Sequence, residues 1–246
     1  MLFFVIPAYN EEKNIPYLLK SIAKRMEEIN RPYRFVVVND GSADDTKAVV
    51  ESYKDRFPIT LLDHKTNMNV GQVFRTAFEY IIKEAASGDI VITKEADNTG
   101  DLGILSDMLK KIDDGYDLVL ASCYAKGGKV IGASMDRLLL SSAANAMLRL
   151  FFPIDGIRTY SSFYRVYRAD TLKKAYGAYG NKFMEEAGFA CMVEALIKLS
   201  RLRIKICEIP MVLRCHRRKG KSKMNKTRTI TAYLRLIAGE FAKRRI

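Results

Sequence analysis

Glu95 and Asp97 are two carboxylates, one residue apart, that follow closely on the apolar run 90–93. This β-branched run is apolar on both faces, which is typical of a buried strand. Ligands bind at the carboxyl ends of the strands in open α/β sheets, and alternate residues of an extended chain point to the same side. Two oxygen ligands presented together there suit a hard divalent cation such as Mg²⁺ or Mn²⁺. The alternative is a strand that ends in a solvated acidic turn.

The elements that would position this pair form an alternating pattern. Five apolar runs alternate with segments of helical periodicity. The expected helices start near Asn14, at Asp44 or Asp45, after Gly71 and near residue 101. The five runs, each expected to be a strand, are 2–6, 34–38, 59–62, 90–93 and 118–121. This alternation predicts an α/β fold with a mainly parallel, Rossmann-like sheet and helices on both faces. Tyr9 and Asp40 would then lie at the same sheet edge as Glu95 and Asp97.

Composition narrows the class of protein. A chain of 246 residues with 48% hydrophobic content can bury a sizeable core. The four cysteines lack CxxC spacing and the chain has only two histidines, which disfavours a zinc site and fits a reducing compartment. We expect His64 to lie solvated at a strand end. The longest uncharged stretch, 138–148, is too short to span a bilayer.

Positive charge is concentrated at the C-terminus. The net charge is +13, and twelve basic residues follow Glu208 against a single acid, Glu240. Such a tail attracts phosphates, nucleic acid or anionic lipid. Because no recognisable RNA- or DNA-binding module accompanies the tail, we do not expect nucleic acid as a partner.

Three short segments follow one another within the first hundred residues: Pro7-Ala8-Tyr9-Asn10-Glu11, Val38-Asn39-Asp40-Gly41-Ser42 and Glu95-Ala96-Asp97-Asn98. Together they resemble the PxYNE, VDDGS and DxD motifs of the family-2 GT-A glycosyltransferases, in order and in spacing. The resemblance implies a GT-A fold and a nucleotide-sugar site at the sheet edge.

The second half of the chain narrows this resemblance. Ala121–Gly128, Tyr160–Arg165 and the basic segment 217–223 are similar to three segments of the dolichol-phosphate mannose synthases: the segment after the fifth strand, the TSGF segment and the RxxGxSK motif. The similarity reaches to about residue 237. It is closest to bacterial relatives that transfer sugars to polyprenyl phosphate.

The resemblance assigns roles residue by residue. The nucleotide would be held by Pro7, Tyr9, Glu11, Val38, Asp40 and Ala96. Asp97 would ligate a divalent metal with Glu95 beside it and Asn98 as a further ligand. Arg217 and Lys223 would neutralise phosphates from a mobile loop. A diphosphate leaving group needs such cations.

Five positions depart from the family pattern. The first Asp of DxD is Glu95, the first Asp of VDDGS is Asn39, and an expected Arg is Cys123. Ser162 stands where the family has the Gly of TSGF, and Thr159 stands where the family has an acidic residue before that segment. These changes point to an altered substrate or reduced activity. The basic residues that could compensate at Cys123 are Lys126, Arg137 and Arg158.

The chain divides into a catalytic domain, 1–213, and a basic C-terminal segment, 214–246. Within the domain we expect a nucleotide-binding half, 1–122, and an acceptor half, 123–213. The C-terminal segment ends in an amphipathic helix whose apolar residues are Ile230, Tyr233, Leu234, Ile237 and Phe241. The helix could pack on the domain or lie on an anionic membrane, aided by Lys243, Arg244 and Arg245. We favour the membrane, because a polyprenyl acceptor would be met there.

These observations favour a metal-dependent, inverting hexosyltransferase that acts peripherally at the cytoplasmic face of a membrane. Its donor would be a nucleotide-diphosphate sugar and its acceptor a polyprenyl phosphate, with a membrane protein or a second copy as a further partner. Two alternatives stay open. One is transfer to a glycan or other hydroxyl, for which Glu185 and Glu186 are the spare carboxylates. The other is a non-catalytic nucleotide-sugar-binding protein.

Overall fold

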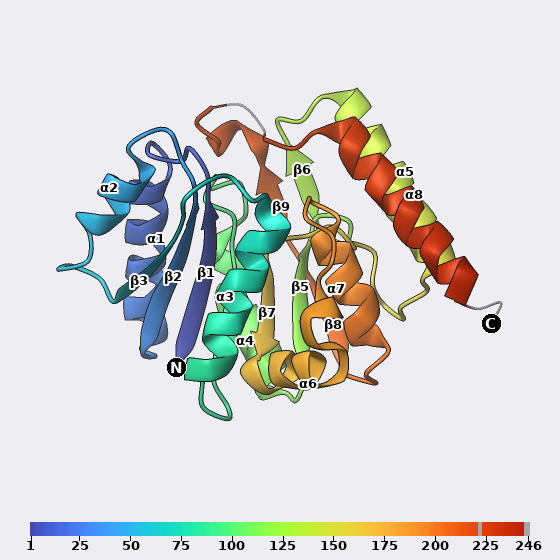
Figure 1. Ribbon diagram of the computed structural model, residues 1–246, viewed down its shortest axis with the longest axis horizontal. Coiled ribbons are helices and arrows are strands. Elements are labelled where there is room, and N and C mark those ends of the chain that lie inside the picture. The colour runs from blue at the N-terminus through green and yellow to red at the C-terminus, as the bar shows by residue number, and fades with distance from the viewer. Residues whose placement is uncertain (221–222, 244–246) are drawn as a thin grey trace.

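The computed structural model of the chain describes residues 1–220 and 223–243 and contains a central seven-stranded sheet (Figure 1). The strand order is β3-β2-β1-β4-β7-β5-β8, and a separate pair, β6 and β9, lies beside the sheet. The strands are β1 (Leu2–Ala8), β2 (Tyr33–Asp40), β3 (Ile59–His64), β4 (Ile90–Thr93), β5 (Leu118–Ser122), β6 (Lys129–Ile131), β7 (Arg165–Arg168), β8 (Ile206–Pro210) and β9 (Val212–Arg214). All neighbours pair in parallel except β7, which is antiparallel to both β4 and β5.

Helices cover both faces of the sheet. They are α1 (Ile15–Ile29), α2 (Thr46–Glu51), α3 (Val70–Glu84), α4 (Leu105–Asp113), α5 (Met135–Phe151), α6 (Ala169–Tyr179), α7 (Cys191–Ser200) and α8 (Lys226–Lys243), with short 3₁₀ turns η1 (Leu102–Ile104), η2 (Gly180–Phe183) and η3 (Cys215–Arg217). Alternate residues of β1 divide between two cores: Phe3 and Val5 face α3 and α7, whereas Phe4 and Ile6 face α1 and α4. This alternation follows from the two-residue period of a strand.

The expected architecture is confirmed, and each of the five apolar runs forms a strand. The sheet also contains strands that the sequence did not predict, of which β7 is the most unusual. It reads Arg-Val-Tyr-Arg, and Arg165 is fully buried within it. The Arg165 guanidinium donates to the backbone oxygens of Ser162 and Tyr160 at 2.7 and 2.8 Å, so it holds the preceding loop under the sheet edge.

The parallel strands β1, β2 and β3 end together, with Ala8 opposite Asn39 and Asp40 opposite His64. The neighbouring strand β4 ends at the same edge, where Thr93 pairs with Val5. The segments that follow these strands therefore meet at one edge of the sheet.

Helix α8 lies beside α5 at one end of the molecule (Figure 1). Its Tyr233 and Ile237 are buried in the same core as Val5, whereas Leu234 is exposed. The buried part of the apolar stripe of α8 thus packs on residues 1–213, which was the less favoured of the two placements. The side chains of Phe241 and Lys243, together with Arg244 and Arg245, lie outside the described part of the chain.

Gly71, in the first turn of α3, packs against the loop before α7. Its N–H donates to the Ala187 oxygen at 2.7 Å, and a Cβ at position 71 would come within 2.0 Å of the Glu186 oxygen. We expect Gly71→Ala to lower the free energy of unfolding by about 1–3 kcal/mol, because the loop backbone must move. Gly177 in α6 has open space around it, so Gly177→Ala should raise stability by roughly 0.5–1 kcal/mol. Urea unfolding of both variants checks the contrast, and equal effects would contradict it.

Candidate active site

Two cavities open at the sheet edge and meet at Glu95 and Asp97. The first, which we call the sheet-edge cavity, has a volume of about 330 Å³. It is lined by five of the six residues expected to hold the nucleotide: Pro7, Tyr9, Glu11, Asp40 and Ala96. The second, the helical cavity, has a volume of about 240 Å³ and lies between α5, α8 and the end of β5. Both cavities are also lined by Phe163, Phe189 and Arg218.

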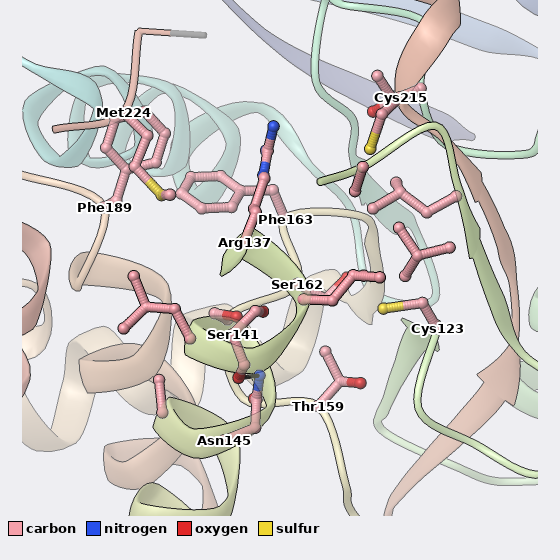
Figure 2. Close-up of a pocket in the computed structure, with 18 of the residues that line it drawn as sticks. Cys123, Arg137, Ser141, Asn145, Thr159, Ser162, Phe163, Phe189, Cys215 and Met224 are labelled. Atoms are coloured by element: carbon pink, nitrogen blue, oxygen red, sulfur yellow. Dashed lines mark hydrogen bonds between the residues drawn. The ribbon is translucent and has the colours of Figure 1, made fainter. Parts of the chain in front are cut away.

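The helical cavity is mainly apolar. Its apolar walls are formed by Leu138, Leu140, Leu148, Leu213 and Ile230, with Ser141, Asn145 and Thr159 as polar groups. Arg137 projects from α5 toward the end lined by Phe163 and Phe189, and Cys123 lies on the opposite wall (Figure 2). Of the three basic residues that could compensate for Cys123, Arg137 is the one that lines this cavity, whereas Lys126 and Arg158 do not.

Asp97 is buried, and protein donors engage both of its oxygens. Its Oδ1 accepts from the Thr99 N–H at 3.0 Å and from the Thr99 hydroxyl at 2.7 Å. Its Oδ2 accepts from Arg218 through Nε at 2.9 Å and through Nη2. The carboxylate is therefore fixed in orientation and paired with a guanidinium that comes from the basic C-terminal segment.

Glu95 lies beside a lysine that has no access to solvent. The Nζ of Lys94 is 3.8 Å from Glu95 Oε2 and 5.3 Å from the centroid of the Tyr164 ring. The Lys94 side chain is completely buried. Because an ammonium is rarely buried without a partner, Lys94 is held there by the carboxylates and by the ring face.

The pKa values of the two carboxylates are shifted in opposite directions. Burial acts to raise the pKa of Asp97, but Lys94 and Arg218 outweigh it and the pKa falls below its ordinary value. Burial raises the pKa of Glu95, with Lys94 only partly offsetting the effect and Asp97 adding to it. Neighbouring groups with pKa values pushed apart are typical of functional sites.

Asp40 is held by a histidine from the adjacent strand. The Nδ1–H of His64 donates to Asp40 Oδ1 at 2.8 Å, and the Met68 N–H donates to the same oxygen at 2.9 Å. The other ring nitrogen, Nε2, is 3.0 Å from the Thr76 hydroxyl. Our prediction of a solvated His64 is therefore wrong, because the β2–β3 register places it opposite Asp40, with a nearly buried side chain.

The basic segment closes over the sheet-edge cavity through Glu11 and Asn14. Lys223 donates to the carboxylate of Glu11 and to the Asn10 oxygen. Asn14 accepts from the Lys219 N–H at 3.1 Å and donates to the Lys219 oxygen at 2.9 Å. Glu11 accepts in turn from Asn14 Nδ2. The segment that carries the RxxGxSK-like motif is thus tied to the loop after β1.

Three expected site residues lie elsewhere. Val38 is fully buried in β2, two residues before Asp40, so its side chain belongs to the core. Asn98 donates to the Asn14 oxygen at 3.1 Å and lines a groove next to Asp101. Arg217 is exposed and lines that same groove, whereas its neighbour Arg218 turns inward to Asp97.

Two departures from the family pattern are structurally accommodated. Asn39 donates to Asp63 Oδ1 at 2.7 Å. Burial raises the pKa of the Cys123 thiol to about 11, so it is protonated near neutral pH and unsuited to act as a nucleophile.

The oxygen donors of Glu95 and Asp97 fit a hard divalent cation in chemical type. In the described part of the chain, no group of three or more His, Cys, Asp or Glu side chains is arranged to hold a metal. The remaining ligands would have to come from a substrate, as is usual for Mg²⁺ bound with phosphates.

Sequence reasoning missed Lys94, Arg218 and His64. A lysine directly after an apolar strand was a signal for Lys94, since charge is unexpected at a buried strand end. No local pattern separates Arg218 from Arg217. His64 could be found only through the pairing of β2 with β3.

Comparison with known proteins agrees with the fold. The family model described as Glycosyl transferase family 2 matches residues 3–175. The chain is 28% identical to a dolichol-phosphate mannosyltransferase of Pyrococcus furiosus over 95% of this chain and 61% of that protein. It is 25% identical to a polyprenol monophosphomannose synthase of Mycolicibacterium smegmatis over 90% of this chain and 80% of that protein.

Two solved structures share the fold at low sequence identity. Residues 1–349 of S. aureus TarS, in complex with UDP-GlcNAc, superpose with a TM-score of 0.61 at 22% identity, covering 97% of this chain and 66% of that one. The glucosyl-3-phosphoglycerate synthase of Mycobacterium tuberculosis, in complex with Mn²⁺, UDP and phosphoglyceric acid, gives a TM-score of 0.66 at 16% identity, covering 97% and 78%.

The raised pKa of Glu95 predicts a pH-dependent stability difference. The pKa of Glu95 is higher in the folded protein than its ordinary value of 4.5. Protonated Glu95 therefore favours the folded state, and wild type loses this stability as the pH rises through the folded pKa. Glu95→Gln has no such loss, so its free energy of unfolding relative to wild type should increase from pH 4.5 to 7. Urea unfolding in metal-free buffer measures it, with exposed Glu27→Gln as the control. A pH-independent difference would contradict the assignment.

Proposed function

Because this chain belongs to glycosyl transferase family 2, we propose that it transfers a hexose from a nucleotide-diphosphate sugar to a polyprenyl phosphate. The names of the two curated relatives support this acceptor class. The observation that carries the proposal is the meeting of two unlike cavities at Glu95 and Asp97. The sheet-edge cavity is lined by polar residues at strand ends. The helical cavity is mainly apolar and is lined by residues of two helices, α5 and α8.

The donor would lie in the sheet-edge cavity. Asp40, held by His64, would accept a hydrogen bond from the base, and Glu11 would accept from the ribose. Tyr9 and Pro7 supply apolar surface against the nucleoside. The diphosphate would then reach Asp97 at the junction of the cavities, where the sugar could face the acceptor.

Asp97, with Glu95 beside it, would hold a divalent cation, Mg²⁺ or Mn²⁺, which would supply positive charge against the diphosphate leaving group. The Mn²⁺ complex of the structurally similar glucosyl-3-phosphoglycerate synthase supports a metal of this kind. Arg218 and Lys223 are the basic residues of the C-terminal segment that line the sheet-edge cavity, and they would neutralise phosphate oxygens. Arg217 faces the other groove, so we assign this role to Arg218.

The acceptor phosphate would enter through the helical cavity. A phosphate monoester is ionised near neutral pH and needs no strong general base, which agrees with the absence of a histidine among the residues lining this cavity. Arg137 can hold the phosphate in line with the anomeric carbon, because a guanidinium binds two oxygens at once. A single displacement would invert the configuration at that carbon.

The surface beside the helical cavity supports a lipid acceptor. Helix α5 exposes Met135, Leu139 and Leu150, with 70%, 67% and 77% of each residue accessible, and these residues share one helical face. Leu234 of the adjacent helix α8 is also exposed. No helix in the described ranges is long and apolar enough to cross a bilayer. We propose that α5 rests on the cytoplasmic face of a membrane, with α8 behind it.

Transfer to a hydroxyl acceptor would require a base. Glu185 is paired with Lys198 at 3.1 Å, whereas burial raises the pKa of Glu186, which lines a cavity next to Phe189 and Lys223. Glu186 is therefore the better base of the two. The acceptor screen below distinguishes this alternative.

We expect a screen of UDP- and GDP-hexoses with a short, water-soluble polyprenyl phosphate and Mg²⁺ or Mn²⁺ to give a glycolipid and released nucleoside diphosphate. Asp97→Asn should reduce turnover by about 10²-fold or more, because the leaving-group charge loses its stabilisation. Asp107→Asn, an exposed carboxylate in the first turn of α4, is the matched control. Product mass and circular dichroism of each variant complete the measurement.

Three outcomes would count against this function. Equal nucleotide release without lipid would mean donor hydrolysis. Product only with sugars or glycans would favour the hydroxyl-acceptor alternative and Glu186. Donor binding without turnover for any acceptor would favour a non-catalytic nucleotide-sugar-binding protein.

The α5 surface gives a separate test of membrane contact. Replacing Met135, Leu139 and Leu150 together by Ser should weaken binding to anionic liposomes by at least about tenfold, because each inserted side chain contributes roughly 1.5–3 kcal/mol when fully buried. Turnover on the short soluble acceptor should stay at the wild-type level. Tyr17→Ser, a substitution of a 55% exposed aromatic on α1, is the control. Unchanged liposome binding would rule out α5 as the contact surface.

A further inference from the structure

The position of Arg218 bears on how a cation reaches Asp97. The guanidinium contacts Asp97 Oδ2 through two nitrogens, and Thr99 occupies Oδ1 through two donors. Each oxygen of this buried carboxylate therefore already accepts two hydrogen bonds from protein donors, as many as it has lone pairs. A divalent cation can ligate Oδ2 only if the guanidinium moves away.

Lys94 differs from Arg218 in that it cannot leave. It is completely buried beneath the pair, and a Cβ added at Gly100 would come within 3.0 Å of its Nζ. Its Nζ lies 3.8 Å from Glu95 Oε2, so its charge stays beside the carboxylates. Lys94 is therefore a permanent counter-charge, and Arg218 is the exchangeable one.

Charge balance is consistent with an exchange. In the structure, two carboxylates face two cations of the chain. A nucleotide-diphosphate sugar carries one negative charge on each phosphate, which matches the charge of one divalent cation. If the donor and the metal enter together, the assembled site stays balanced only if Arg218 remains within it.

The geometry points to an exchange, and we propose that Arg218 is the resident counter-ion of Asp97, displaced by the divalent cation and passed to the donor diphosphate. This inference rests on the proposed metal-dependent function. It makes Arg218 a competitor of the metal before the donor binds and a phosphate ligand afterwards. Removing Arg218 should therefore strengthen metal binding while weakening catalysis.

The backbone around Arg218 is anchored on both sides, so rotation of the side chain is sufficient for the exchange. Before it, Arg214 pairs with Asp101 at 2.8 Å, and its N–H donates to the Thr99 oxygen at 2.9 Å. After it, Lys219 is held by Asn14. Because Arg218 lines both cavities, a guanidinium released from Asp97 stays within reach of a diphosphate at their junction.

The test measures Mn²⁺ binding to the full chain by electron paramagnetic resonance of free Mn²⁺, without nucleotide. Arg218→Ala should bind Mn²⁺ about tenfold more tightly than wild type, since a neighbouring cation changes the proton affinity of a carboxylate by a similar factor or more. Arg217→Ala removes the same charge one residue away and should leave Mn²⁺ affinity within about twofold of wild type. Turnover of Arg218→Ala should fall by about 10²-fold.

A second comparison separates exchange from general electrostatics. Arg218→Lys keeps the charge but loses the two-nitrogen contact with Oδ2, so its Mn²⁺ affinity should lie between those of wild type and Arg218→Ala. Asp97→Asn should no longer bind Mn²⁺, whereas Arg218→Ala should bind it more tightly than wild type. Circular dichroism and urea unfolding confirm that each variant is folded.

The outcomes distinguish the two proposals. If wild type binds Mn²⁺ and Arg218→Ala binds it no more tightly, the exchange is wrong while the metal site stands. If Arg217→Ala and Arg218→Ala strengthen binding equally, the effect is general charge and the exchange is wrong. If no variant binds Mn²⁺, even with UDP or GDP, the metal-dependent function fails and the exchange fails with it.

Discussion

The constraint on which the rest of the site depends is the close placement of two carboxylates after β4, the buried Asp97 and the partly buried Glu95. Removing like charges from water is unfavourable unless cations accompany them. One cation, Lys94, comes from the strand end itself, and the other, Arg218, lies 121 residues after Asp97. The basic segment after β9 must therefore fold back onto the sheet edge, which also closes the sheet-edge cavity and separates it from the groove beside α1.

The fold was predictable where burial leaves a simple pattern. Strands β1 to β5 are apolar runs, because parallel strands covered on both faces are apolar throughout. Strand β7 has no such pattern, since Arg165 is buried by bonding to backbone oxygens rather than by apolar contact. Its place between β4 and β5 depends on long-range pairing that no local periodicity encodes.

The site was predictable to the extent that it follows from strand ends. Parallel strands end at one edge, so the sequence alone places Tyr9, Asp40, Glu95 and Asp97 together. The cations of the basic loop could be located only to within a residue. Arg217 is the last residue of the 3₁₀ turn η3, whereas Arg218 follows it with extended backbone. The two side chains therefore line different cavities although both fit the same basic pattern.

The junction at Asp97 links the two cavities through a single side chain. Arg218 lines both of them, so whatever holds its guanidinium affects the donor side and the acceptor side together. With Arg218 on Asp97, the Nε and Nη2 donors of the guanidinium are engaged and cannot bind a phosphate in either cavity. With the guanidinium released, it adds positive charge at the place where the leaving diphosphate and the attacking phosphate would both be negative. The two carboxylates differ in their cations: Glu95 lies 3.8 Å from the Nζ of the buried Lys94, whereas Asp97 is the partner that Arg218 and a metal would share.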